Sequence, residues 1–148
     1  MITLPSFLRS HLLLIEDNGG DAKLLSEALH EVDRSVVVHH LMFFHDALRY
    51  LAKIDEFAGS PTPYLIVLDL NLPRVDGLTG LRVLRDTPTW SGIPVAVMTS
   101  SQRPLERSAA TDLGAMGCFT KPTEWEDYLR IAKVFSAARP GNREARTH

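Results

Sequence analysis

The chain has 148 residues, 45% of them hydrophobic, and a formal net charge of −2, which predicts one globular domain with a buried core and no nonspecific binding to nucleic acid. It has one cysteine, no apolar run of the roughly 18 residues that span a membrane, and no secretory signal, so we expect a cytoplasmic protein without internal disulfides. We expect the domain core to cover about residues 11–137, between an N-terminal extension at 1–10 and a polar tail at 139–148.

Short apolar runs alternate with longer segments of helical periodicity along the chain. The predicted strands cover residues 11–16, 35–42, 64–69, 94–98 and 116–120. After each strand, apolar residues recur every three or four positions and predict a helix. The apolar positions of the five helices are Leu24, Leu25, Ala28, Leu29 and Val32; Ala47, Leu48, Leu51 and Ala52; Leu78, Leu81 and Leu84; Leu105, Ala109 and Leu113; and Trp125, Leu129, Ala132 and Phe135. Five strand–helix units predict an α/β fold, a doubly wound parallel sheet with helices on both faces.

Polar residues stand where four of these five strands end. Asp69 closes the apolar strand 64–69, Glu16 and Asp17 end the first strand, Thr99 follows the fourth and Lys121 follows the fifth. The carboxyl ends of parallel strands meet at one edge of a sheet, where ligands bind in this class of fold. Each residue alone would serve as a turn or capping residue, but the set together predicts a functional site.

The acidic residues of this set predict a metal site. Carboxylates within a few ångströms of one another repel by roughly 4 kcal/mol per close pair at an effective dielectric of about 20, and a divalent cation removes that repulsion. Mg²⁺ prefers oxygen ligands and keeps several waters. We therefore expect Mg²⁺ to be held by Glu16, Asp17, Asp69 and the backbone carbonyl of Asn71.

The remaining residues of the set suit phosphoryl transfer. We expect Asp69 to attack phosphorus as the nucleophile. Lys121 would bind a phosphoryl oxygen as a point charge. Pro122 would help to position it, since the residue before a proline is held in an extended conformation. Thr99 would supply a hydroxyl donor, and the loops that carry Thr99 and Lys121 would move toward the added phosphoryl group.

These residues resemble those of the receiver domains of two-component response regulators, the CheY-like family. The resemblance covers about residues 12–135 and rests on Glu16 and Asp17, the segment 69–77 (DLNLPRVDG), Thr99, and Lys121 followed by proline. It implies a flavodoxin-like three-layer sandwich with strand order 2-1-3-4-5. It also implies an aspartyl-phosphate on Asp69, formed with Mg²⁺ from a phosphohistidine of a partner sensor histidine kinase. Such a protein is a phosphoacceptor rather than an enzyme, although it assists its own phosphorylation and dephosphorylation.

One position departs from the family pattern. Three residues before Lys121, where the family usually places an aromatic side chain that swings inward or outward, this chain has Cys118. A thiol cannot transmit a movement of Thr99 as a large ring does, so we expect a shift of loops instead. Cys118, the long loop before the strand 64–69 and the lack of residues for a DNA-binding output domain resemble the stand-alone regulators that are paired with phytochrome-type light-sensing kinases.

This similarity implies a homodimer through the predicted fourth helix, fifth strand and fifth helix. Charged residues on these segments would pair across a two-fold interface. They are Arg103, Glu106, Arg107, Glu126, Asp127, Arg130 and Lys133.

Two other functions stay open. A phosphatase with an aspartyl nucleophile also uses a threonine, a lysine and Mg²⁺, but it needs a second aspartate two residues after the nucleophile. Asn71 occupies that position in this chain and cannot shuttle a proton. A module that docks a partner without phosphorylation would show no Mg²⁺-dependent response, although this chain keeps every acidic and basic element of the site.

Overall fold

The computed structural model describes residues 9–140 of the chain. The strands are β1 (Ser10–Ile15), β2 (Val36–Leu41), β3 (Leu65–Asp69), β4 (Val95–Thr99) and β5 (Gly117–Thr120), and the helices are α1 (Gly19–Val32), α2 (Phe44–Ala52), the short 3₁₀ helix η2 (Asp55–Phe57), α3 (Gly77–Asp86), α4 (Pro104–Asp112) and α5 (Trp125–Ala137). All five strands are parallel and lie in the order β2-β1-β3-β4-β5. The predicted fold class and strand order are therefore confirmed. Most of the predicted N-terminal extension and polar tail lies outside the described residues.

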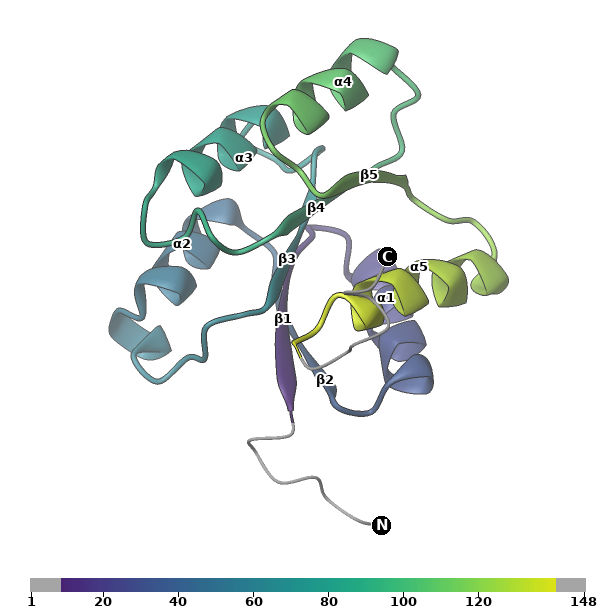
Figure 1. Ribbon diagram of the computed structural model, residues 1–148, viewed down its shortest axis with the longest axis horizontal. Helices are drawn as coiled ribbons and strands as arrows, with labels where there is room; N and C mark the ends of the chain where they lie inside the picture. Colours follow the sequence, from purple (N-terminus) through teal and green to yellow (C-terminus); the bar gives the residue numbers. More distant parts are fainter. Residues whose placement is uncertain (1–8, 141–148) are drawn as a thin grey trace.

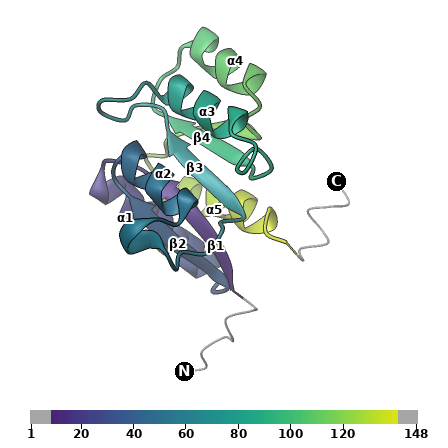
Figure 2. The same ribbon diagram turned by 90° about the vertical axis from the view of Figure 1, so that its left-hand side faces the viewer.

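Two layers of helices cover the sheet (Figure 1 and Figure 2). Helices α1 and α5 pack against each other on one face, and α2, α3 and α4 cover the other. Successive side chains of a strand point to opposite faces. In β1, Leu12 and Leu14 pack with α1 and α5, whereas Leu13 and Ile15 pack with the opposite helices. Every residue of β3 and β4 is buried, which explains why these strands are continuous apolar runs in the sequence.

The register of the strands brings the polar residues to one edge of the sheet. Asp69, the last residue of β3, lies beside Met98 of β4. Thr99, the last residue of β4, lies beside Thr120, the last residue of β5. The residues that pair at the end of β1 and β3 immediately precede Glu16 and Asp69. The edge formed by the carboxyl ends of the strands therefore carries the candidate site.

Local contacts fix the segments that follow β1 and β3. The Oδ1 of Asn18 accepts a hydrogen bond from the backbone N–H of Asp21 at 3.0 Å and so caps α1. Asp76 caps α3 in the same way. Gly77, the first residue of α3, lies so close to the backbone of Leu70 that a Cβ there would be 2.4 Å from the Leu70 Cα. The loop after Asp69 is thus pressed against the start of α3.

Among the five α-helices of the described residues, α4 has the fewest buried residues. Ala110 is its only buried residue, and Leu105, one of the apolar positions that predict this helix, is 85% exposed. The helix approaches the sheet through a small residue and through polar contacts instead. No helix within residues 9–140 has the length and apolar character needed to cross a membrane.

Candidate functional site

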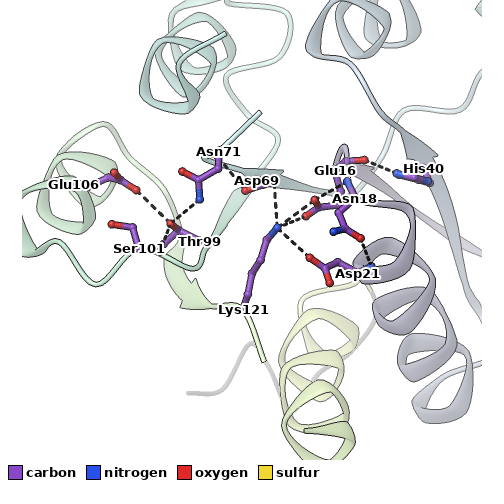
Figure 3. A network of polar contacts seen from close by, with 10 residues as sticks. All are labelled: Glu16, Asn18, Asp21, His40, Asp69, Asn71, Thr99, Ser101, Glu106 and Lys121. Carbon is purple, nitrogen blue, oxygen red and sulfur yellow. Dashed lines mark hydrogen bonds and ion pairs between the residues drawn. The ribbon is translucent and has the colours of Figure 1, made fainter. Parts of the chain in front are cut away.

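Three acidic side chains meet where β1 and β3 end, and Figure 3 draws two of them, Glu16 and Asp69. Glu16 and Asp17 follow β1, and Asp69 is the last residue of β3. One carboxylate oxygen of each residue lies within 4.8 Å of those of the other two. Glu16 and Asp69 are only 4% and 1% exposed, and Asp17 is half-buried. The structure thus brings three of the four predicted metal ligands together.

This donor set fits a hard divalent cation. Carboxylate oxygens are the ligands that Mg²⁺ prefers, and buried carboxylates at this separation repel one another unless positive charge compensates them. The fourth predicted ligand, Asn71, follows in the same turn, since its backbone N–H donates to Oδ1 of Asp69 at 2.9 Å. Glu16, Asp17 and Asp69 are the side chains that would hold Mg²⁺.

Lys121 lies among the acidic residues and neutralises part of their charge. Its Nζ is 2.9 Å from Oε2 of Glu16, 3.1 Å from Oδ2 of Asp69 and 3.3 Å from Oδ2 of Asp21. The lysine side chain is 16% exposed. The single ammonium of Lys121 therefore forms ion pairs with three carboxylates. Negative charge from the acidic side chains still exceeds the positive charge at the site.

Burial and the surrounding charges shift the protonation of this cluster. Burial raises the pKa of Glu16, and Asp69 adds to the effect, while Lys121 and the backbone N–H of Asn18 oppose it. Burial alone would lower the pKa of Lys121, but its hydrogen bond to Glu16 and the charge of Asp69 raise it above its ordinary value. Lys121 therefore stays cationic and can pair with an added anion.

A second set of polar groups surrounds the hydroxyl of Thr99, which is fully buried at the end of β4. This oxygen accepts from the backbone N–H of Ser101 at 2.9 Å and from Nδ2 of Asn71 at 3.4 Å. It donates to Oε1 of Glu106, in α4, at 3.2 Å. An open cavity of about 700 Å³ adjoins this cluster and is lined by Asn71, Ser100, Ser101, Gln102, Arg103, Pro104 and Glu106. Asn71, Ser101 and Glu106, the three hydrogen-bond partners of the Thr99 hydroxyl, thus lie in the wall of this cavity, whereas Thr99 and Asp69 do not line it.

The position of Cys118 differs from the family pattern in its surroundings as well as in its side chain. Cys118 packs toward the core that α4 covers, and burial raises the pKa of its thiol. Phe119, one residue later, points to the opposite face and packs edge-on against Phe135, with ring centroids 5.2 Å apart. Arg107 of α4 instead covers this part of β5, because its Nη2 donates to the carbonyl of Cys118 at 2.7 Å and its Nη1 to the hydroxyl of Thr120 at 3.3 Å.

Two acidic residues contact the site although the sequence does not single them out for it. Asp21 reaches Lys121 from the first turn of α1, and Glu106 reaches Thr99 from the first turn of α4. Acidic residues are common in the first turn of helices because they interact favourably with the helix dipole. Their sequence positions therefore carry no separate signal of these contacts.

Comparisons with known proteins agree with this fold. The family model for the response regulator receiver domain matches residues 12–133. Response regulator Rcp1 from Synechocystis sp. is 33% identical over 125 residues, which cover 82% of this chain and 83% of Rcp1.

Two solved structures extend the comparison. The Mn²⁺-bound form of Rcp1 is 30% identical, with a TM-score of 0.76 over 86% of this chain and 92% of that chain. The phosphorylated cyanobacterial phytochrome response regulator RcpA is 31% identical, with a TM-score of 0.80 over 87% of this chain and 92% of that chain. These similarities confirm the predicted resemblance to phytochrome-associated regulators. The chain belongs to the response regulator receiver domain family, as a CheY-like response regulator of a two-component system that is homologous to phytochrome response regulators.

Proposed function

We propose that this chain accepts a phosphoryl group on Asp69 from a phosphohistidine of a phytochrome-type sensor histidine kinase. The observation that carries the proposal is the setting of the Asp69 carboxylate. It is buried at the end of β3, yet it faces a cationic lysine at 3.1 Å and two further carboxylates. A buried carboxylate next to two others is costly to keep ionised unless cations compensate it, and such costly arrangements are typical of functional sites. Because the kinase takes its phosphoryl group from ATP, the proposal also locates the chain in the cytoplasm.

The proposed reaction is an in-line transfer. An oxygen of Asp69 attacks phosphorus while the bond between phosphorus and the kinase imidazole breaks, and the electron pair stays on the imidazole nitrogen, which takes up a proton from water. Mg²⁺, when bound by Glu16, Asp17 and Asp69, supplies positive charge for the phosphoryl oxygens. Lys121 pairs with one phosphoryl oxygen, and the hydroxyl of Thr99 donates to another. The chain then relays the signal by a conformational change and by protein–protein contacts.

A phosphatase activity is the weaker alternative. It needs an acid or base at position 71, where the amide of Asn71 is engaged as a donor to Thr99. We expect Asn71→Asp to be the variant that gains turnover if the site can act in this way.

The proposal includes a homodimer through α4, β5 and α5. Four apolar side chains on or beside these elements are exposed, namely Leu105 at 85%, Met116 at 42%, Trp125 at 42% and Val134 at 41%. Of the charged residues expected at this interface, Glu106 accepts from Thr99 and Arg107 donates to β5 of the same chain, while Arg130 pairs with Asp127 of its own helix. Arg103, Glu126 and Lys133 remain as the candidates for pairs across the interface.

Intact-mass spectrometry after incubation with acetyl phosphate tests the central step. We expect a Mg²⁺-dependent phosphoryl adduct that is stable in acid and labile in base, with acetate as the leaving group. Asp69→Asn should abolish the adduct, whereas Asp86→Asn, at an exposed aspartate of α3, should keep it. A chain that forms no adduct but still binds its kinase would be a docking module that works without phosphate.

A further inference from the structure

The single proton of the Thr99 hydroxyl is already engaged in a hydrogen bond in this structure. A threonine hydroxyl donates one hydrogen bond and accepts up to two. The Thr99 hydroxyl accepts two hydrogen bonds, from the side chain of Asn71 and the backbone N–H of Ser101. It donates its one hydrogen bond to Glu106. Figure 3 shows this cluster beside Asp69 and Lys121. The proposed function, however, requires the same proton for a phosphoryl oxygen.

We propose that Glu106 is a positioning residue that holds the Thr99 proton until the chain is phosphorylated, so that phosphorylation releases α4 from the sheet. The inference rests on the proposed function, because it assumes that Thr99 donates to the phosphoryl group on Asp69. Glu106 itself does not touch the reacting atoms and acts through Thr99. It is suited to this role because its carboxylate is half-buried and a hydrogen bond to a charged acceptor is stronger than one to a neutral group.

Hydrogen bonds connect the phosphorylation site to α4 without a break. Oδ1 of Asp69 accepts from the backbone N–H of Asn71, whose side chain donates to Thr99, which in turn donates to Glu106. A phosphoryl group adds about 1.5 to 2 negative charges beside this chain of bonds. It attracts the Thr99 proton and repels the Glu106 carboxylate. Both effects favour loss of the Thr99–Glu106 bond.

Loss of the Thr99–Glu106 hydrogen bond would weaken the attachment of α4 to the sheet, because this helix has little apolar packing. Ala110 is the only buried residue of the helix, so polar contacts contribute much of its attachment. The neighbour of Glu106 is Arg107, which binds the carbonyl of Cys118 and the hydroxyl of Thr120. Movement of the first turn of α4 therefore disturbs the contact with β5 at the position where the family has its aromatic side chain. In this chain Glu106 and Arg107 therefore transmit the movement of Thr99 to β5, which the small side chain of Cys118 cannot do.

The test measures binding of beryllofluoride, a phosphoryl mimic, in the presence of Mg²⁺. We expect Glu106→Ala to bind it about tenfold more tightly than the native chain, because the Thr99 proton no longer has to leave a charged acceptor. Glu106→Gln keeps an acceptor oxygen and the size of the side chain, so its affinity should lie between those of the other two. It also serves as the folded variant if the alanine variant is unstable. The matched control is Glu31→Ala, since Glu31 is an exposed glutamate of α1 that lies outside both the candidate site and the predicted dimer face.

Two further measurements separate this role from a merely structural one. In the Thr99→Val background, Glu106→Ala should no longer change the affinity, since the hydroxyl through which it acts is gone. Hydrogen exchange of residues 103–113 should rise when beryllofluoride binds to the native chain. In Glu106→Ala it should already be high without the ligand and change little.

The outcomes distinguish this inference from the proposed function. If the native chain shows no Mg²⁺-dependent binding of beryllofluoride, the proposed function fails and the role of Glu106 fails with it. If the native chain binds it and Glu106→Ala stays within about twofold of both the native chain and Glu31→Ala, the role of Glu106 is overturned while the proposed function stands. An equal effect of Glu106→Ala with and without the Thr99 hydroxyl also overturns it.

Discussion

The Nζ of Lys121 lies 3.1 Å from Oδ2 of Asp69, which joins the residue after β5 to the last residue of β3. The same ammonium contacts Oε2 of Glu16 at 2.9 Å. Two carboxylates that are almost completely buried therefore depend on a single cation. Removal of one partner of a buried ion pair costs about 3–5 kcal/mol, because the other charge is left uncompensated.

Lys121→Met should therefore lower the free energy of unfolding by about 2–4 kcal/mol in the absence of Mg²⁺. Added Mg²⁺ should raise the Tm of this variant more than that of the native chain, since the carboxylates of Glu16 and Asp69 no longer have a competing ammonium. Thermal unfolding with and without Mg²⁺ measures both effects. Lys133→Met, at an exposed position of α5, is the control and should respond to Mg²⁺ as the native chain does. Equal Mg²⁺ responses in all three proteins would contradict this account of the ion pair.

Gly77 provides a test of the packing beneath the loop that follows Asp69. A Cβ at this position would be 2.4 Å from the Cα and 2.6 Å from the carbonyl oxygen of Leu70, so backbone has to move. Gly77→Ala should cost about 1–3 kcal/mol in urea unfolding and should lower the rate of labelling at Asp69. Gly92→Ala adds the same methyl group where no atom lies within 4 Å and should leave both quantities unchanged.

The fold was largely predictable from the sequence, because burial on both faces makes β3 and β4 continuous apolar runs and because the helices have clear apolar periodicity. The exceptions concern the surface. Leu105 continues the apolar stripe of α4 but points to solvent, and η2 has no apolar pattern that predicts it. Periodicity shows which side chains share a face of a helix. It does not show how much of that face meets a neighbour.

The position of the site was predictable for the same topological reason. Parallel strands end at one edge, so Glu16, Asp17, Asp69, Thr99 and Lys121 had to come close together once the strands were identified. The contacts of Asp21 and Glu106 could not be anticipated in this way. They depend on where the first turns of α1 and α4 lie relative to the sheet, and this follows from tertiary packing rather than from spacing in the sequence.

Asp33 links the end of α1 to the end of α5 and should make stability depend on pH. Its carboxylate accepts from Ser35, from Ser136 at 2.7 Å and from Nε of Arg139 at 2.7 Å. Burial alone would raise the pKa of Asp33, but these hydrogen bonds outweigh it and lower the pKa to about 2, from an ordinary value of 3.8. The unfolded chain therefore takes up this proton first as the pH falls, and the stabilisation is complete above about pH 4 and lost toward pH 2.

Asp33→Asn should consequently lower the free energy of unfolding by about 1–2 kcal/mol at pH 7 and by much less at pH 2. Urea unfolding at a series of pH values between these limits measures the difference. The free energy of unfolding of Asp112→Asn, a variant at an exposed position of α4, should depend on pH in the same way as that of the native chain. A constant difference between Asp33→Asn and the native chain across this range would exclude the titration of Asp33 as its cause.

Leu105 offers the clearest test of the proposed homodimer. A side chain of this size that is 85% exposed would be covered when α4 and α5 meet their counterparts across a two-fold axis. Leu105→Glu should shift the chain to a monomer in light scattering, with an unchanged Tm for the monomer because no core contact is lost. Leu24→Glu, on the exposed side of α1, should leave the oligomeric state as it is. A native chain that is monomeric at all concentrations, with and without phosphorylation, would remove the dimer from the proposal.

If phosphorylation releases α4 as we propose, the light packing of this helix also sets the background activity of the chain. A helix with one buried residue is separated from its displaced state by a small difference in free energy. A gap of about 1.4 kcal/mol would leave roughly one molecule in ten in the displaced state before any phosphoryl group arrives. Each polar contact that holds α4 to the sheet would thus lower the population of the displaced state without phosphorylation. Each contact would also increase the free energy that phosphorylation has to supply to displace the helix.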